Sequence, residues 1–332
     1  MTAVIAESAG PAEPSGPGSP AAPPAPAPTG RGRIVLARLL AARWAVAGAV
    51  VVLLLFLLAF GGELATPWDY ATPDYGALRQ PPSGTHWFGT NGVGQDVFAQ
   101  TVRGLQKSLV IGLLVALFST VLASLVGACA GYFGGWTDRL LMFLVDLMLV
   151  FPAFLVITIV SPRLKGAGWL AFVLLLALFN WMITARVVRS MTISLREREF
   201  VRAAQFMGVR PLRIILRHIL PNVASFLIID ATIAVGGAVM SETALSYFGF
   251  GVKAPDVSLG TLLAAGTSEA PVFPWLFYFA AGLLVLFVLA VNLIGDGLRD
   301  ALDPTSDAAR RPRRSRTGAR ARARAEKKRT SA

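Results

Sequence analysis

Six long apolar stretches constrain this chain more than any other feature of its sequence. A bilayer crossing needs about 17–25 mostly apolar residues. Stretches able to provide one occupy residues 44–60, 108–132, 140–160, 168–185, 223–239 (with an extension to 248 left open) and 275–294. In hydrocarbon, backbone polar groups must be satisfied within the segment, so runs of this length favour helices. We therefore predict an all-α membrane protein with six transmembrane helices.

The composition and the placement of charge agree with a membrane protein. Charged residues make up 15% of the 332, against about 25% in soluble domains. The net charge of +12 would also fit a nucleic-acid-binding protein, so the positions of the charges decide. With a cytosolic N-terminus, 25 of the 31 Lys and Arg residues fall on the cytosolic side, which is the positive-inside pattern. We predict a multi-pass protein of the cytoplasmic (inner) membrane with cytosolic N- and C-termini, and no nucleic acid partner.

The chain divides into four parts by composition. Residues 1–30 hold eight Pro and eight Ala but no Lys or Arg, which predicts a disordered cytosolic leader. Residues 31–107 hold the first transmembrane helix and an external segment. Residues 108–304 form the core domain with the other five transmembrane helices. Residues 305–332 carry eleven Lys and Arg and are predicted to be a disordered basic cytosolic tail.

The sequence offers no catalytic or metal site. Cys129 is the single cysteine, and the two histidines, His86 and His218, lack a metal-ligand spacing. A P-loop needs a lysine directly after a glycine, and none of the five lysines follows one. We predict no cofactor in this chain and no ATP hydrolysis by it.

A cytosolic connection over residues 186–222 carries eight Arg, and its centre, residues 199–208, is predicted to be a short helix. Gly208 can end this helix. Such an amphipathic helix either docks on a partner protein or lies on anionic lipid, and the pattern alone leaves both open. The apolar stripe consists of residues at helical spacing: Phe200, Ala203, Ala204 and Met207.

The same connection carries a family resemblance. Residues 199–222 read EFVRAAQFMGVRPLRIILRHILPN and resemble the EAA loop of permease subunits in ABC-type importers. Arg202 stands where that motif has Glu. The matching positions are Ala203, Ala204, Gly208, Leu220 and Pro221.

A second segment narrows the resemblance. Residues 86–97 read HWFGTNGVGQDV and are similar to an external segment of dipeptide and oligopeptide permeases, with Asn91 and Gln95 in place of the usual Asp and Arg. Residues 131–138, 244–252 and 295–304 are also similar to this subfamily. The resemblance covers about residues 34–304 and is to the second permease subunit of peptide importers.

This resemblance implies a fold, a role and partners. The fold would be that of a type I ABC importer permease, with residues 199–222 as the EAA-like loop that carries a cytosolic coupling helix. The chain would move di- or oligopeptides, driven by two separate ATP-binding subunits that hold ATP and Mg. A second homologous permease, an extracytoplasmic substrate-binding protein and membrane lipid would be its other partners. The residues implied to couple to the ATP-binding subunit are Glu199, Phe200, Arg202, Ala203, Ala204, Met207 and Gly208.

Two rival functions remain beside peptide import. Relatives of the family import nickel or another small solute with the same machinery. A stand-alone secondary transporter or channel is the rival from another class. Such transporters often show repeated halves, and no internal repeat is visible here.

Three acidic residues lie within or at the end of apolar stretches: Asp146, Asp230 and Glu242. A charge at bilayer depth costs about 2.5–3.5 kcal/mol, so such residues face the bundle interior or a wet path. They either line the translocation path or hold helices together by hydrogen bonds. Pro152 is predicted to kink the third stretch because it has no backbone N–H and so removes one helix hydrogen bond. The kink is either part of a gate or an architectural feature.

Small residues form one face of the second stretch. Gly127 and Gly131 are four residues apart, and Ala123 extends the row by one more turn. This spacing lets two helix backbones approach closely. The partner is either another helix of this chain or a helix of a second subunit.

Gly208→Glu is expected to uncouple transport without stopping membrane insertion, because it alters the turn that ends the predicted coupling helix. Membrane fractionation and ATP-dependent uptake measure the two effects separately. Normal uptake by this variant would contradict the coupling role.

Overall fold

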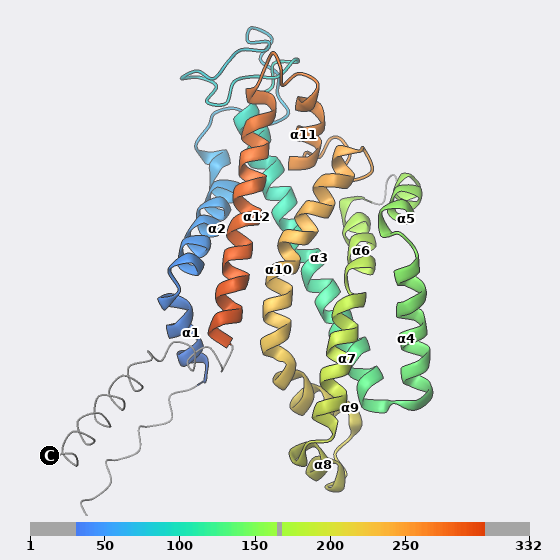
Figure 1. Ribbon diagram of the computed structural model, residues 1–332. Helices are drawn as coiled ribbons and strands as arrows, with labels where there is room; N and C mark the ends of the chain where they lie inside the picture. The colour runs from blue at the N-terminus through green and yellow to red at the C-terminus, as the bar shows by residue number, and fades with distance from the viewer. Residues whose placement is uncertain (1–30, 165–167, 303–332) are drawn as a thin grey trace, which may run out of the picture.

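The computed structural model describes residues 31–164 and 168–302 and is a bundle of helices over that part of the chain (Figure 1). The predicted leader 1–30 and tail 305–332 lie outside the described residues. Across the described residues there is no strand beyond two isolated bridges, and the all-α prediction is confirmed there. The helices are α1 (Arg31–Ala41), α2 (Arg43–Gly61), η1 (Gly62–Leu64), α3 (Val97–Phe133), α4 (Gly135–Val150), α5 (Ala153–Val160), η2 (Ser161–Leu164), α6 (Gly168–Asn180), α7 (Met182–Arg196), α8 (Glu199–Phe206), α9 (Pro211–Ile214), the π-helical turn η3 (Ile215–Ile219), α10 (Leu220–Tyr247), α11 (Leu259–Thr267) and α12 (Trp275–Leu302).

The described residues contain four helices that are long and apolar enough to cross a membrane, and six spans if each of two bent pairs counts as one. The four unbroken spans are Arg43–Leu64, Val97–Phe133, Pro211–Tyr247 and Trp275–Leu302. The bent pairs are α4 with α5, at 80°, and α6 with α7, at 47°. The predicted six stretches therefore correspond to four unbroken spans and two bent helix pairs.

The two breaks differ in their residues. Pro152, which lacks a backbone N–H, directly precedes α5, so the predicted kink is a complete break between two helices. The break between α6 and α7 contains no Pro or Gly and was not predicted. The side-chain amide of Asn180, the last residue of α6, donates to the carbonyl oxygen of Leu176 at 2.8 Å.

Helix α3 begins earlier than the apolar stretch indicated. The carboxylate of Asp96 accepts from the N–H of Ala99 at 2.7 Å and caps the helix. The 37 residues of α3 span about 55 Å at 1.5 Å per residue, well beyond the hydrocarbon core. The boundary placed between residues 107 and 108 therefore falls inside α3. The first turns carry Arg103 and Lys107, and Lys107 pairs with Asp256 at 2.9 Å.

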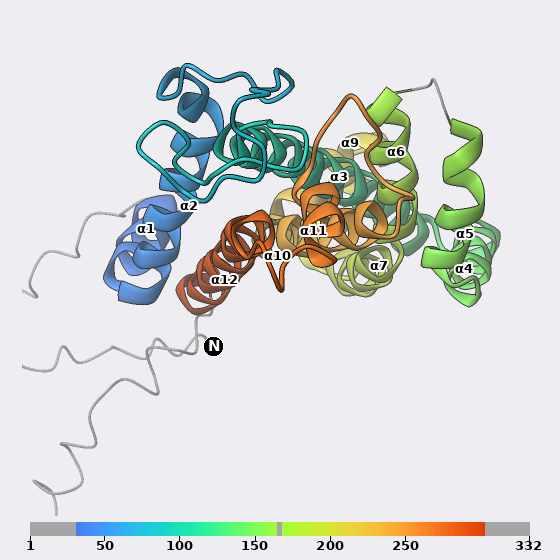
Figure 2. The same cartoon turned by 90° about the horizontal axis from the view of Figure 1, so that it is seen from above.

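Helix α3 is the central element of the bundle. It packs along α7 and α10, while α12 packs on α10 and α2. Seen from above, the helices form an elongated row that runs from α1 and α2 at one side to α4 and α5 at the other (Figure 2). We call the end of the bundle that carries α8 the α8 end. The other end, with residues 65–96 and α11, is the opposite end (Figure 1).

The small-residue face of α3 is filled by α7 of the same chain. An added Cβ on Gly127 would lie 2.4 Å from the carbonyl oxygen of Ala185, and one on Gly131 would lie 2.6 Å from that of Arg189. Ala123 is fully buried and packs in a cluster that includes Ala185. Of the two interpretations left open by the sequence, the structure shows packing within this chain.

Gly127→Ala is expected to lower stability by about 1–3 kcal/mol, the usual cost of overpacking. The matched control is Gly237→Ala in α10, where an added Cβ meets nothing within 4 Å and helix propensity favours Ala by about 1 kcal/mol. Thermal unfolding in one detergent should therefore move in opposite directions for the two variants. Equal shifts would contradict the close packing of α3 on α7.

Candidate functional site

Helix α8 projects at the α8 end between α7 and α9 (Figure 1). Its inner side consists of Val201 and Ala204, which are 0% and 2% exposed. Both belong to a hydrophobic cluster with Ile214, Ile215 and Ile219. The inner side of α8 thus rests on the first turns of the helical run that leads into α10.

The outer side of α8 is apolar and exposed. Phe206 is 91% exposed and Met207 is 74% exposed, and Phe200 and Ala203 are also exposed. Exposed apolar groups gathered in one place indicate an interaction surface. We call Phe200, Ala203, Phe206 and Met207 the α8 surface.

The predicted stripe is therefore divided between two sides. Ala204, which was expected to contact a partner, instead faces the chain's own hydrophobic cluster. Val201, three residues earlier, is buried in the same cluster. Phe206, which the stripe omitted, is the most exposed side chain of the group. A possible sequence signal was the apolar pair Phe206 and Met207 directly before the helix-ending Gly208.

Gly208 turns the chain after α8. Its φ of +72° is in the left-handed region, which residues with a Cβ adopt at a cost. Its N–H donates to the carbonyl of Gln205 at 3.0 Å. This turn holds Met207 beside Phe206 and directs the chain into α9.

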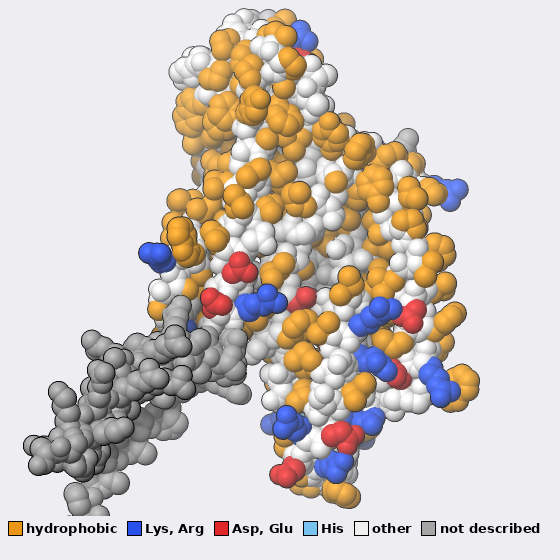
Figure 3. Space-filling view, in the orientation of Figure 1, with side chains coloured by type: hydrophobic (Ala, Val, Ile, Leu, Met, Phe, Trp, Pro, Cys, Tyr) orange, Lys and Arg blue, Asp and Glu red, His pale blue; other side chains and the backbone are white. Residues whose placement is uncertain are grey.

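Charged side chains flank the α8 surface. Arg202 donates to the carboxylate of Glu197 at 2.5 Å, so the residue that replaces the motif's Glu is bound to a neighbouring turn. This hydrogen bond holds the pKa of Glu197 below its usual value. Glu199 lies in the first turn of α8, where a negative charge stabilises the helix by interacting with its dipole. On the face drawn in Figure 3, most charged side chains lie toward the α8 end.

The acidic residues of the apolar stretches all contact other helices. Asp146 of α4 forms an ion pair with Arg186 of α7, and both side chains are about half exposed. Asp230 of α10 accepts a hydrogen bond of 2.8 Å from Thr184 of α7. Polar groups from α4 and α10 therefore both meet α7.

A second ion pair between α4 and α7 was not predicted. Arg189 binds the carboxylate of Asp138 through two of its nitrogens. Arg189 and Arg186 are three residues apart and so lie on one side of α7. The sequence placed these arginines in the cytosolic connection, whereas the structure includes them in α7.

Glu242 is in a different environment. Its side chain is 0% exposed, and the hydroxyls of Ser108 and Ser246 donate to its two carboxyl oxygens. A substrate has no access to the carboxyl group in this structure. The bonds made by Glu242 are those expected of a residue that holds helices together.

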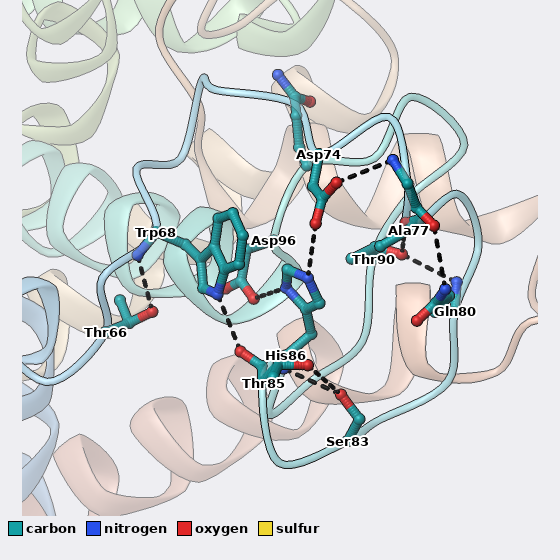
Figure 4. A network of polar contacts seen from close by, with 12 residues as sticks. Thr66, Trp68, Asp74, Ala77, Gln80, Ser83, Thr85, His86, Thr90 and Asp96 are labelled. Atoms are coloured by element: carbon teal, nitrogen blue, oxygen red, sulfur yellow. Dashed lines mark hydrogen bonds and ion pairs between the residues drawn. The ribbon is translucent and has the colours of Figure 1, made fainter.

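At the opposite end, residues 65–96 fold around a buried histidine (Figure 4). His86 is 2% exposed, and its Nδ1 lies 2.8 Å from Oδ2 of Asp96, the residue that caps α3. Its Nε2 lies 3.7 Å from Oδ2 of Asp74. The ring of Trp68 lies against the imidazole, with centroids 4.5 Å apart. His86 therefore joins this segment to the start of α3.

The rest of the 86–97 motif also makes structural contacts. Phe88 stacks on Phe279 of α12 with centroids 3.8 Å apart. Asn91 donates to the side-chain oxygen of Gln95 at 2.9 Å. The two neutral residues found in place of Asp and Arg thus bind each other directly.

Fold and site together define an integral membrane protein of helices that carries an exposed apolar helix at one end. Residues 123–307 match the family model described as the binding-protein-dependent transport system inner membrane component. Residues 30–82 match the N-terminal TM domain of oligopeptide transport permease C.

Two relatives agree with these matches in sequence. The oligopeptide transport system permease protein OppC of Mycobacterium tuberculosis is 56% identical, over 85% of this chain and 97% of its own. OppC of Bacillus subtilis is 33% identical over 78% of this chain and 85% of its own. A solved inward-facing structure of the MetNI methionine ABC transporter gives a TM-score of 0.48 at 20% identity, covering 61% of this chain and 97% of that one. The chain belongs to the family of inner membrane components of binding-protein-dependent transport systems, as the resemblance predicted, and this is a family of transport permeases rather than enzymes.

His86→Ala is expected to open the segment of residues 65–96, because it leaves the buried carboxylate of Asp96 without its ring partner at a cost of about 1–3 kcal/mol. Limited proteolysis with fragment mass analysis should show faster cleavage within this segment. His218→Ala, which removes the other histidine of the chain, is the control. Equal cleavage of both variants and the wild type would contradict the role of His86.

Proposed function

We propose that this chain is the membrane-spanning permease subunit of an ATP-driven importer of di- or oligopeptides. The observation that carries the proposal is the α8 surface, an exposed apolar helix whose inner side rests on the base of a transmembrane helix. The family membership and the names of the relatives support peptides as the cargo. ATP and Mg would be held by two separate ATP-binding subunits.

The proposed orientation places the α8 end in the cytosol and residues 65–96 outside. Both termini would then be cytosolic. The concentration of arginines near α7 and α8 supports this orientation. An extracytoplasmic substrate-binding protein would dock at the opposite end of the bundle, and a second homologous permease would complete the path through the membrane.

Within the bundle, the path is proposed to run along the side of α7 that carries polar partners. The side chains of the ion pair Asp146–Arg186 are about half exposed. Charged side chains that face lipid at bilayer depth are costly. A path between this chain and the second permease would give them a wet or protein environment. The break at Pro152 allows α4 and α5 to differ in direction along that path.

The α8 surface is proposed to seat in the ATP-binding subunit. Phe206 is the most exposed side chain of the α8 surface, and burying it contributes about 1.5–3 kcal/mol. Movement of the ATP-binding subunit would press α8 against the cluster of Ile214, Ile215 and Ile219, and so reach α10.

Phe206→Ser is expected to reduce co-purification of the ATP-binding subunits about tenfold or more, because the apolar contact is lost. The matched control is Leu64→Ser, since Leu64 is also 91% exposed but lies at the opposite end. In proteoliposomes holding the complete transporter and the binding protein, ATP-dependent uptake of tritium-labelled tetraalanine should fall in parallel for Phe206→Ser.

Three outcomes would count against the proposal. Wild-type uptake without the ATP-binding subunits would favour a stand-alone transporter. Uptake of radioactive nickel ions but not of peptide would favour the other cargo. Equal co-purification of Phe206→Ser and Leu64→Ser would remove the α8 surface from the interface.

A further inference from the structure

Glu242 is the centre of a buried polar cluster that the proposed mechanism has not used. It lies near the end of α10, away from α8, and is 0% exposed. The hydroxyl of Ser108 in α3 donates to Oε2 at 2.8 Å. The hydroxyl of Ser246, one turn further along α10, donates to Oε1 at 2.6 Å. Both carboxyl oxygens are thus bound, one by each of two helices.

Each serine hydroxyl also accepts a hydrogen bond from the connection between α10 and α11. The N–H of Val252 donates to Ser246 Oγ at 3.0 Å, and the N–H of Leu259 donates to Ser108 Oγ at 3.2 Å. Leu259 is the first residue of α11. The carboxyl group therefore orients two hydroxyls that hold the connection and the start of α11.

Three glycines leave no free space around these bonds. An added Cβ would lie 2.1 Å from Ser246 Oγ on Gly251, 2.5 Å from the carbonyl oxygen of Thr243 on Gly260, and 3.0 Å from the carbonyl carbon of Ser258 on Gly104. The backbones of α3, α10, α11 and the connection thus meet directly. We call this arrangement of Glu242, the two serines and the three glycines the Glu242 joint.

The joint lies at one end of an uninterrupted helical run. Residues Pro211–Tyr247 form one span of 37 residues, and Leu220 and Glu242 are about 33 Å apart at 1.5 Å per residue. The other end of this run carries the isoleucines on which Val201 and Ala204 of α8 rest. One helical element therefore connects the inner side of α8 with the Glu242 joint.

We infer that Glu242 is a positioning residue of the transport cycle, which ties α11 and the connection 248–258 to α10 so that movement at α8 reaches the opposite end. The inference rests on the proposed function, because it needs α8 to be moved by a nucleotide-binding partner. Glu242 acts here through the two serines, not through contact with substrate. Its two acceptor oxygens are what allow both hydroxyls to donate at once.

Glu242→Gln tests this with little change of shape. An amide has one acceptor oxygen and one NH2 donor, so only one serine can keep its bond as donor. Ser246→Ala and Ser108→Ala each remove one of the two hydrogen bonds to Glu242, and they replace the Gln variant in the test if that variant does not assemble. Ser119→Ala is the matched control, because Ser119 is also a buried serine of α3 but its hydroxyl bonds to the carbonyl of Ala116 in its own helix.

The measurement is hydrogen–deuterium exchange of the complete transporter in lipid nanodiscs, with and without AMP-PNP and Mg. In the wild type and in Ser119→Ala, the nucleotide should change exchange in residues 199–214 and in residues 248–262. In Glu242→Gln the change in 199–214 should remain, while the change in 248–262 should fall at least fivefold.

The possible results separate this inference from the proposed function. A wild-type response of 248–262 in Glu242→Gln, and in the two serine variants, would overturn the inference alone. Loss of the response in both segments of these variants would show a general structural role and would also overturn it. Absence of a nucleotide response in 199–214 of the wild type would contradict the proposed function itself.

Discussion

The structure depends on the close approach of α3 to its neighbours through residues that have no side chain. Gly127 and Gly131 bring the backbone of α7 against one part of α3, and Gly104 brings the start of α11 against another. Without a Cβ, the contact is made by backbone atoms whose positions are set by the helices themselves. Close-packed interiors have low compressibility and transmit strain, so these contacts leave little room for a change in helix spacing. A long central helix with glycines near both ends can therefore act as a fixed reference for the helices that pack on it.

Helix α8 meets two opposite requirements on its two sides. Its inner side must bury enough to hold it in place, and Val201 and Ala204 do this against three isoleucines. Its outer side must stay apolar and exposed, which Phe206 and Met207 do. The helix is thus held by its own chain and still offers contact area to another. An isolated helix of eight residues would be marginal in water, so its stability comes from the seat beneath it.

Sequence periodicity and apolar length predicted the helical spans, the helix at residues 199–208 and the small-residue face of α3, because burial imposes these patterns locally. The rest depended on contacts between residues far apart. The start of α3 was missed because Arg103 and Lys107 interrupt the apolar pattern of its first turns, although Asp96 is a local cap signal. The contact between the ring of His86 and the carboxylate of Asp96 forms only in the folded segment. The position of α9 determines which side of α8 is covered by the chain's own residues. Phe206 lies on the side that stays exposed. The bend between α6 and α7 has no signal in the apolar pattern, because that break contains neither Pro nor Gly.

The two ion pairs between α4 and α7 also constrain how the protein is made. Asp138 and Asp146 are synthesised before their arginine partners, which follow 51 and 40 residues later. Of the two aspartates, only Asp146 lies within the apolar stretch of residues 140–160, where an unpaired charge costs about 2.5–3.5 kcal/mol. The ion pair of Asp146 with Arg186 can form only after α7 has been synthesised. The packing of α4 on α7 through these ion pairs therefore forms after α7 emerges and does not follow the order of synthesis helix by helix.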